Sequence, residues 1–163
     1  MITLQPLRWG KPYESMELKD VVHFDTGEPI AKFGTVGGGI VGRDMKQAHK
    51  AREALLQFTP AELIEMSKKA ADLFENAELK VGDSMQSVDQ FVHQQSASTG
   101  LPEHMCRSNL KKNSCVLSNI DDILDCLTRG LDLNILSKGF GEEGRGVIVS
   151  YQAQTPSLVA VLH

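Results

Sequence analysis

The sequence predicts a single α/β domain with strands near its N-terminus, about four helices including one long helix, and two strands near its C-terminus. Turn-forming residues separate short alternating runs in the first forty positions. Apolar residues then recur every three or four positions through the middle of the chain, as on helices. Alternation returns from Val147. A length of 163 residues suffices for one sizeable core.

The N-terminal strands are predicted on either side of a turn at Asp25-Thr26-Gly27. Residues 30–35 alternate loosely between apolar and polar side chains, which indicates one or two strands arranged as a hairpin. Lys32 and Gly34 within this run suit a partly exposed strand rather than a central one.

The stretch VGGGIVG follows and has two interpretations. Gly37, Gly39 and Gly42 spell G-x-G-x-x-G, a pattern that can cradle a pyrophosphate at a helix N-terminus. A dinucleotide site also needs a second parallel strand soon after the helix, with an acidic residue for the ribose. The chain has a capped helix from Thr59 at that place, so the sequence favours a flexible glycine linker.

The first two helices are predicted over residues 42–58 and from Pro60 to Ala77. Thr59 is a suitable N-cap for the second, and Glu62 completes a capping box. The apolar stripe of this second helix is expected to consist of Leu63, Met66, Ala70, Leu73, Phe74 and Ala77.

The third helix is expected to begin at Ser84 as its N-cap and to end at Gly100. The fourth runs from about Glu103 to Arg129, roughly 40 Å at 1.5 Å per residue. A helix of that length lies along a whole domain, or it breaks at the polar residues 111–114.

The C-terminal part is predicted to contain two strands. Residues 139–146, GFGEEGRG, read as a flexible turn, and residues 146–154 alternate as a strand does. The apolar run Leu158–Leu162 follows Pro156 and is typical of a strand buried on both faces.

Composition argues against two classes of partner. The net charge is −4 and there is no basic block, so we expect neither nucleic-acid binding nor attachment to an acidic membrane. No apolar stretch approaches the ~18 residues of a membrane span, and the N-terminus shows no apolar signal segment. Three cysteines without a repeated spacing suggest a reducing compartment, so the cytoplasm is expected.

The chemistry-bearing residues form no recognisable constellation. Cys106, Cys115 and Cys126 fall within the fourth helix and read as buried or half-buried structural residues rather than nucleophiles or metal ligands. The histidines are scattered, and none makes a metal-binding spacing. Asp121 and Asp125 share one helix row, which favours a solvated face over a calcium loop. No catalytic or metal-binding residue is therefore assigned.

The order of elements resembles the N-terminal third of a member of the aldehyde dehydrogenase superfamily. The resemblance spans nearly the whole chain, although no single motif in it is specific. The opening KPYESMELKDV is also faintly similar to the ring-cleavage and acyl-CoA-related branch. The residues that carry the resemblance are Thr26, Gly27, Glu28, Ile30, Ala31, Ala48, Ala51, Thr99, Gly100, Pro156 and Val159 to Leu162.

The resemblance implies that residues 1–163 are a partial cofactor-binding domain of an NAD- or NADP-dependent enzyme. In that family a cysteine thiolate attacks an aldehyde to form a thiohemiacetal, hydride passes to the nicotinamide, and water or coenzyme A releases the acyl group. None of these catalytic roles maps onto a residue of this chain. Leu162 and His163 abut the family's cofactor-binding turn and are the cofactor-binding candidates.

The resemblance also implies that the chain is a fragment or natural truncation that is inactive alone. Residues 145–154 correspond to the strand region through which the family oligomerises, so we expect a homo-oligomer formed through the strands at 145–163. The alternative is a non-catalytic helical interaction module whose C-terminal strands pair with a partner chain.

Overall fold

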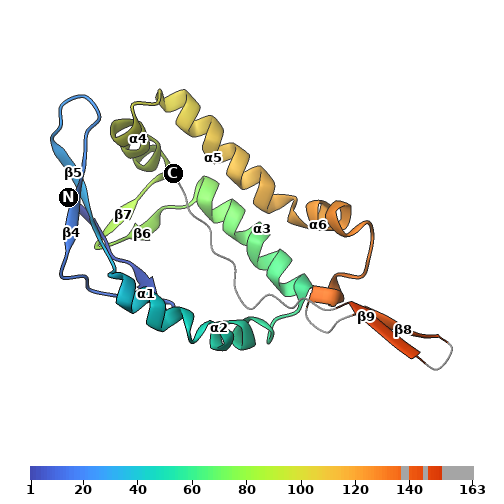
Figure 1. Cartoon of the computed structure of the whole chain (residues 1–163). Coiled ribbons are helices and arrows are strands. Elements are labelled where there is room, and N and C mark those ends of the chain that lie inside the picture. Colours follow the sequence, from blue (N-terminus) through green and yellow to red (C-terminus); the bar gives the residue numbers. More distant parts are fainter. Residues whose placement is uncertain (137–139, 145–146, 152–163) are drawn as a thin grey trace.

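The computed structural model describes residues 1–136, 140–144 and 147–151, which form a mixed α/β structure with six α-helices and several small sheets (Figure 1). The helices are α1 (Gly38–Met45), α2 (Ala48–Leu55), α3 (Pro60–Asn76), α4 (Val88–Thr99), α5 (Glu103–Ser118) and α6 (Ile120–Thr128), with the 3₁₀ turn η1 (Leu133–Leu136). The strands are β1 (Ile2–Leu4), β2 (Leu7–Arg8), β3 (Lys11–Pro12), β4 (Leu18–Val22), β5 (Pro29–Gly34), β6 (Leu79–Val81), β7 (Ser84–Gln86), β8 (Phe140–Gly144) and β9 (Val147–Tyr151).

The N-terminal strands form a three-stranded sheet in the order β1-β5-β4. The predicted hairpin is confirmed, because β4 and β5 pair antiparallel around a turn in which Gly27 has a φ of 72°. The expectation that residues 30–35 avoid a central position is wrong, since β1 pairs parallel along the other edge of β5. The strand is nevertheless partly exposed: the exposed face of the sheet carries the Lys32–Asp20 ion pair at 3.8 Å.

The glycine-rich stretch is helical, so the interpretation as a flexible linker is wrong. Helix α1 begins at Gly38, and its residue Asp44 accepts two hydrogen bonds from Arg8 of β2, at 2.7 and 2.8 Å. This contact with a distant strand stabilises a helix that its glycines disfavour. The single helix predicted over 42–58 is also wrong, because the chain leaves helical geometry at Gln47 before α2 begins.

Helix α3 has the predicted start but a different buried face. Both hydrogen bonds of the capping box form between Thr59 and Glu62. The helix meets α5 through Ala71, whose carbonyl oxygen accepts a hydrogen bond from Ser114 Oγ at 3.2 Å. The buried face is therefore rotated away from the predicted stripe, and Met66 of that stripe is 49% exposed.

Helix α4 begins three residues later than predicted. Ser87, not Ser84, is the N-cap, because only Ser87 is followed at N3 by a glutamine, Gln90, that completes a capping box. Ser84 lies instead in β7, which pairs with β6. The predicted end is confirmed, since Gly100 has the left-handed φ of 76°.

The predicted long helix is two helices, α5 and α6, with the break at Asn119 rather than within residues 111–114. The side-chain amide of Asn119 donates to the carbonyl oxygen of Cys115 at 2.7 Å. Such a local bond competes with the helical backbone, which explains why the chain turns there. The count of about four helices is therefore too low for the described residues.

The core lies where α3, α4 and α5 meet (Figure 1). Val92, Cys106 and Leu110 are buried there. Phe74 and Phe91 pack against them and meet each other edge to face, with ring centroids 5.5 Å apart. This three-helix centre is the best-packed part of the described chain.

The C-terminal prediction is confirmed in part. Residues 147–151 form β9, as the alternation predicts, but residues 140–144 form β8 and not a flexible turn. The two strands pair antiparallel, with Glu142 opposite Val149. The run Leu158–Leu162 and the cofactor-binding candidates Leu162 and His163 lie outside the described residues.

Candidate functional site: an apolar cavity between sheet and helix

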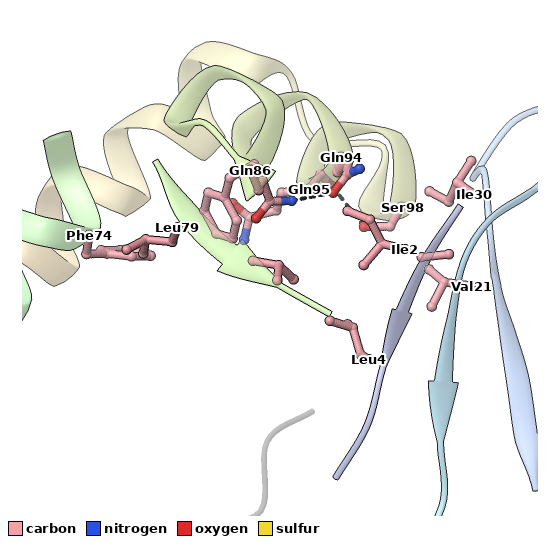
Figure 2. Close-up of a pocket in the computed structure, with 13 residues that line it drawn as sticks. Ile2, Leu4, Val21, Ile30, Phe74, Leu79, Gln86, Gln94, Gln95 and Ser98 are labelled. Atoms are coloured by element: carbon pink, nitrogen blue, oxygen red, sulfur yellow. Dashed lines mark hydrogen bonds between the residues drawn. The ribbon is translucent and has the colours of Figure 1, made fainter. Parts of the chain in front are cut away.

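A cavity of about 460 Å³ separates the three-stranded sheet from α4 and the β6–β7 hairpin (Figure 2). Ile2, Ala31 and Val21 form its floor, because they are register neighbours across the three strands. Residues directly opposite one another in a sheet share a face, so the three side chains present one apolar surface. Leu4 extends this surface along β1.

The opposite wall is also largely apolar. Phe91 comes from α4, Phe74 from the end of α3, and Leu79 and Val81 from β6. The same aromatic pair therefore packs against the three-helix core and closes one side of the cavity.

Glutamine side chains supply the polar part of the wall. Gln86 Nε2 donates to Gln94 Oε1 at 2.5 Å, which joins β7 to α4. Gln95 Oε1 is buried and accepts no hydrogen bond from any described residue. Ser98, one turn further along, donates to the carbonyl oxygen of Gln95 at 3.2 Å.

The lining contains neither a charged side chain nor a cysteine or histidine. A nucleophile needs a thiolate or an activated hydroxyl beside a base, and a general acid or base needs a titratable group. The cavity can therefore bind an apolar group, but its described lining supplies no group for acid–base or covalent chemistry.

The cysteines lie away from this cavity. Cys106 is buried in the core, where its thiol approaches the carbonyl oxygen of Leu101 at 3.7 Å, as expected for a structural residue. Cys115 and Cys126 are exposed, so the expectation that they are buried or half-buried is wrong. Cys115 lies in α5 and Cys126 lies in α6, two helices that are separated by the break at Asn119.

Two of the pairs that shift a pKa join separate elements at the surface. The hydrogen bond from Arg8 lowers the pKa of Asp44 and raises the pKa of the guanidinium, which also lies 5.0 Å from the ring centroid of Tyr13. Lys68 Nζ lies 2.6 Å from Asp121 Oδ2, which lowers the pKa of Asp121. Asp121 therefore joins α6 to α3 while its side chain stays 42% exposed, so the predicted solvated face also carries a contact between helices.

The described ranges contain no group of three or more histidine, cysteine, aspartate or glutamate side chains arranged to hold a metal ion. His93 pairs with a single carboxylate, with its Nδ1 at 2.9 Å from Glu103 Oε1. Nor does any helix in the described portion combine the length and apolarity that a membrane crossing requires.

The G-x-G-x-x-G pattern does not form a dinucleotide site in the described chain. Helix α1 does follow a strand, β5, and has Gly37 as its N-cap. The next elements are α2 and α3, so the second parallel strand and its acidic residue are not found there. The stretch from Gly37 to Gly42 thus lacks the strand that a Rossmann dinucleotide site requires after its first helix.

The glutamine-lined cavity was not predicted from the sequence. The only local signal is the pair Gln94-Gln95, which interrupts the polar and apolar pattern of α4. A glutamine in a helix is equally compatible with a solvated face, so this signal has little specificity.

The chain matches no model of a known protein family, and it matches no curated protein. The resemblance to the aldehyde dehydrogenase superfamily therefore stays a prediction that rests on the sequence.

Proposed function

We propose that this chain is part of an NAD(P)-dependent aldehyde dehydrogenase and that it serves there as scaffold rather than as the source of reacting groups. The order of elements supports this proposal. A hairpin at Gly27 precedes the alanine-bearing helix α2, the capped helix α3, α4 ending at Thr99-Gly100, and β9. These elements keep the order on which the resemblance is based, while α1, the β6–β7 hairpin, the α5–α6 break and β8 are additional to it.

The proposal that this chain supplies no reacting group is based on the positions of its reactive side chains. The proposed reaction oxidises an aldehyde through a cysteine thiohemiacetal to an acid or an acyl-CoA. Cys106 is enclosed by the core, and the candidate cavity has no titratable lining. We therefore assign no described residue a catalytic role, and Leu162 and His163 remain the proposed cofactor-side residues.

The proposed assembly is a homo-oligomer formed through the strands at 145–163. The β8–β9 hairpin supports it, because a two-stranded ladder has further backbone edges that can pair with another chain. Light scattering at matched concentration compares the wild-type chain with Val149→Lys. Wild-type self-association that the lysine weakens is expected, and a wild-type chain that stays monomeric at high micromolar concentration contradicts the proposal.

The proposed location is the cytoplasm. Its support is that Cys106, Cys115 and Cys126 are all free thiols, which a reducing compartment preserves. Differential alkylation of thiols in the native cell, before and after reduction, checks this expectation.

The activity test uses the complete product of the gene alongside the 163-residue chain. Aldehyde-dependent formation of NADH or NADPH is expected from the complete product and not from the chain alone. Cys106→Ala in the complete product should retain turnover, because that thiol is structural. Activity of the isolated chain that Cys106→Ala abolishes would show that the assignment of Cys106 is wrong.

A non-catalytic interaction module is the second candidate, and one observation favours it. An apolar groove of about 320 Å³ opens between α2, α3 and α6, lined by Leu55, Phe58, Leu63, Ile64, Ile120 and Leu124. A complete gene product that turns over no aldehyde with either nicotinamide favours this candidate over the enzyme.

A further inference from the structure

We propose that the cavity between the three-stranded sheet and α4 is a binding site for a small, uncharged, mostly apolar molecule that carries a hydrogen-bond donor. This inference goes beyond the proposed function and does not depend on it, because it concerns a site that has no catalytic group. Its basis is the size of the cavity, the absence of charged side chains from its lining, and a buried acceptor, Gln95 Oε1, that has no hydrogen-bond partner among the described residues (Figure 2).

The size and lining are those of a ligand pocket. A volume of about 460 Å³ lies within the range of about 300–1,000 Å³ typical of small-molecule sites, which are mainly apolar with a few polar groups. None of the lining side chains is charged. A charged occupant would lose its hydration without gaining an ion pair, so the cavity selects an uncharged one.

A hydrogen bond and a close backbone contact set the distance between the walls. At the C-terminal end of α4, the backbone N–H of Phe24 donates to the carbonyl oxygen of Ala97 at 2.9 Å. At the hairpin turn, Gly82 lies so near β1 that an added Cβ would be 2.5 Å from the carbonyl oxygen of Thr3. The sheet and the opposite wall are therefore fixed to each other at separate places, which opposes collapse of the space that they enclose.

The polar wall specifies the hydrogen-bonding character of the ligand. Gln94 Oε1 already accepts from Gln86, whereas Gln95 Oε1 accepts from no described residue. A buried acceptor without a donor is unfavourable, because it loses its hydrogen bond to water without gaining another. The last torsion of a glutamine has a broad preference, so the Gln95 amide can turn its oxygen toward a ligand N–H or O–H.

The experiment uses two fluorescent probes that differ at one group. N-Phenyl-1-naphthylamine is uncharged and has one N–H donor, and 1-benzylnaphthalene replaces that N–H by CH₂. Each is titrated against the wild-type chain and against Gln95→Leu, with Gln57→Leu as the control because Gln57 is an exposed glutamine outside the cavity. Circular dichroism establishes that each variant keeps its helix content.

The wild-type chain should bind the amine with a dissociation constant at least tenfold lower than that of Gln95→Leu. The dissociation constant of 1-benzylnaphthalene should differ by less than about twofold between the wild-type chain and Gln95→Leu. Gln57→Leu should bind either probe with the wild-type dissociation constant. Ala31→Phe, which fills the floor of the cavity, should abolish binding of both probes.

Three results would overturn the proposal. The first is failure of both probes to saturate the wild-type chain, and the second is equal weakening of both probes by Gln95→Leu. The third is release of the amine from the cavity when a higher chain concentration causes self-association. A polypeptide segment, and not a small molecule, would then be the occupant of the cavity.

Discussion

The three-helix centre and the N-terminal sheet differ in how many sides of each element are covered. In the centre, α5 packs against both α3 and α4, and Leu110 on its inner face is 3% exposed. In the sheet, one face lies over the cavity and the other carries charged side chains, and Leu18 of the edge strand β4 is 44% exposed. Similar apolar residues thus bury very different areas.

This difference implies unequal local stability. Burial contributes roughly 25 cal/mol for each Å² of apolar surface removed from water, so the centre gains most of the available hydrophobic free energy. Regions with few buried contacts open at lower free energy than the core does. Backbone amides of β4 and β5 should therefore exchange with solvent faster than those of α4 and α5.

The largest expected effect is that of truncation in the centre. Leu110→Ala should lower the free energy of unfolding by about 3 kcal/mol, because it removes a buried side chain and leaves a cavity. Leu18→Ala should cost less than about 1 kcal/mol, since that side chain is already half in water. Urea denaturation of both variants measures the difference. Equal losses would contradict the contrast between the two regions.

An intermediate effect is expected from two glycines that occupy opposite backbone conformations. Gly100→Ala should destabilise the chain by about 1–2 kcal/mol, because the left-handed conformation is strained for alanine. Its Cβ would also lie 3.0 Å from the Phe24 ring. Gly39→Ala should instead stabilise by up to about 1 kcal/mol, since Gly39 is helical with open space around it.

Thermal melts of the two glycine variants test this pair. Opposite shifts in melting temperature are expected. A Gly39→Ala variant that leaves the melting temperature unchanged would argue for a linker in place of α1.

The capping box of α3 should have a smaller effect. Thr59→Ala should cost about 1 kcal/mol, because it removes the oxygen that accepts from the Glu62 N–H at 3.2 Å. Denaturant melts that coincide for variant and wild type would show that Thr59 does not cap the helix.

The smallest expected effect is the pH dependence of the same box. Hydrogen bonds from the Thr59 backbone and hydroxyl lower the pKa of Glu62. Its contribution is therefore complete above the ordinary glutamate pKa of about 4.3 and is lost as the pH falls through the lowered value. Glu62→Gln keeps the geometry without the titration. Its stability relative to wild type should improve on acidification, whereas a constant difference would contradict the assignment.

The sequence predicted features whose determinants lie within a few residues of one another. The Thr59–Glu62 box and the Gly100 terminus are such features, and both are confirmed. The start of α4 was missed by three residues because Ser84 and Ser87 are both possible caps, and only the glutamine after Ser87 decides between them.

Features that depend on distant contacts could not be predicted. Helix α1 is stabilised by an ion pair between Arg8 and Asp44, which are 36 positions apart in the sequence. The glycines of α1, considered without this contact, therefore led to the prediction of a linker. The buried face of α3 is chosen by its contact with Ser114, which no periodicity within α3 reveals. The cavity combines five separate strands with α3 and α4, so its glutamines look like surface residues in the sequence.

The contact between Ala71 and Ser114 has a consequence for which substitutions this fold tolerates. Two small side chains face each other there, and the Ser114 hydroxyl reaches the α3 backbone itself. The separation of two packed helix axes, 8–10 Å in general, depends on the side chains at the crossing. Related sequences that keep this crossing should vary freely at Met66 but only among small residues at positions 71 and 114.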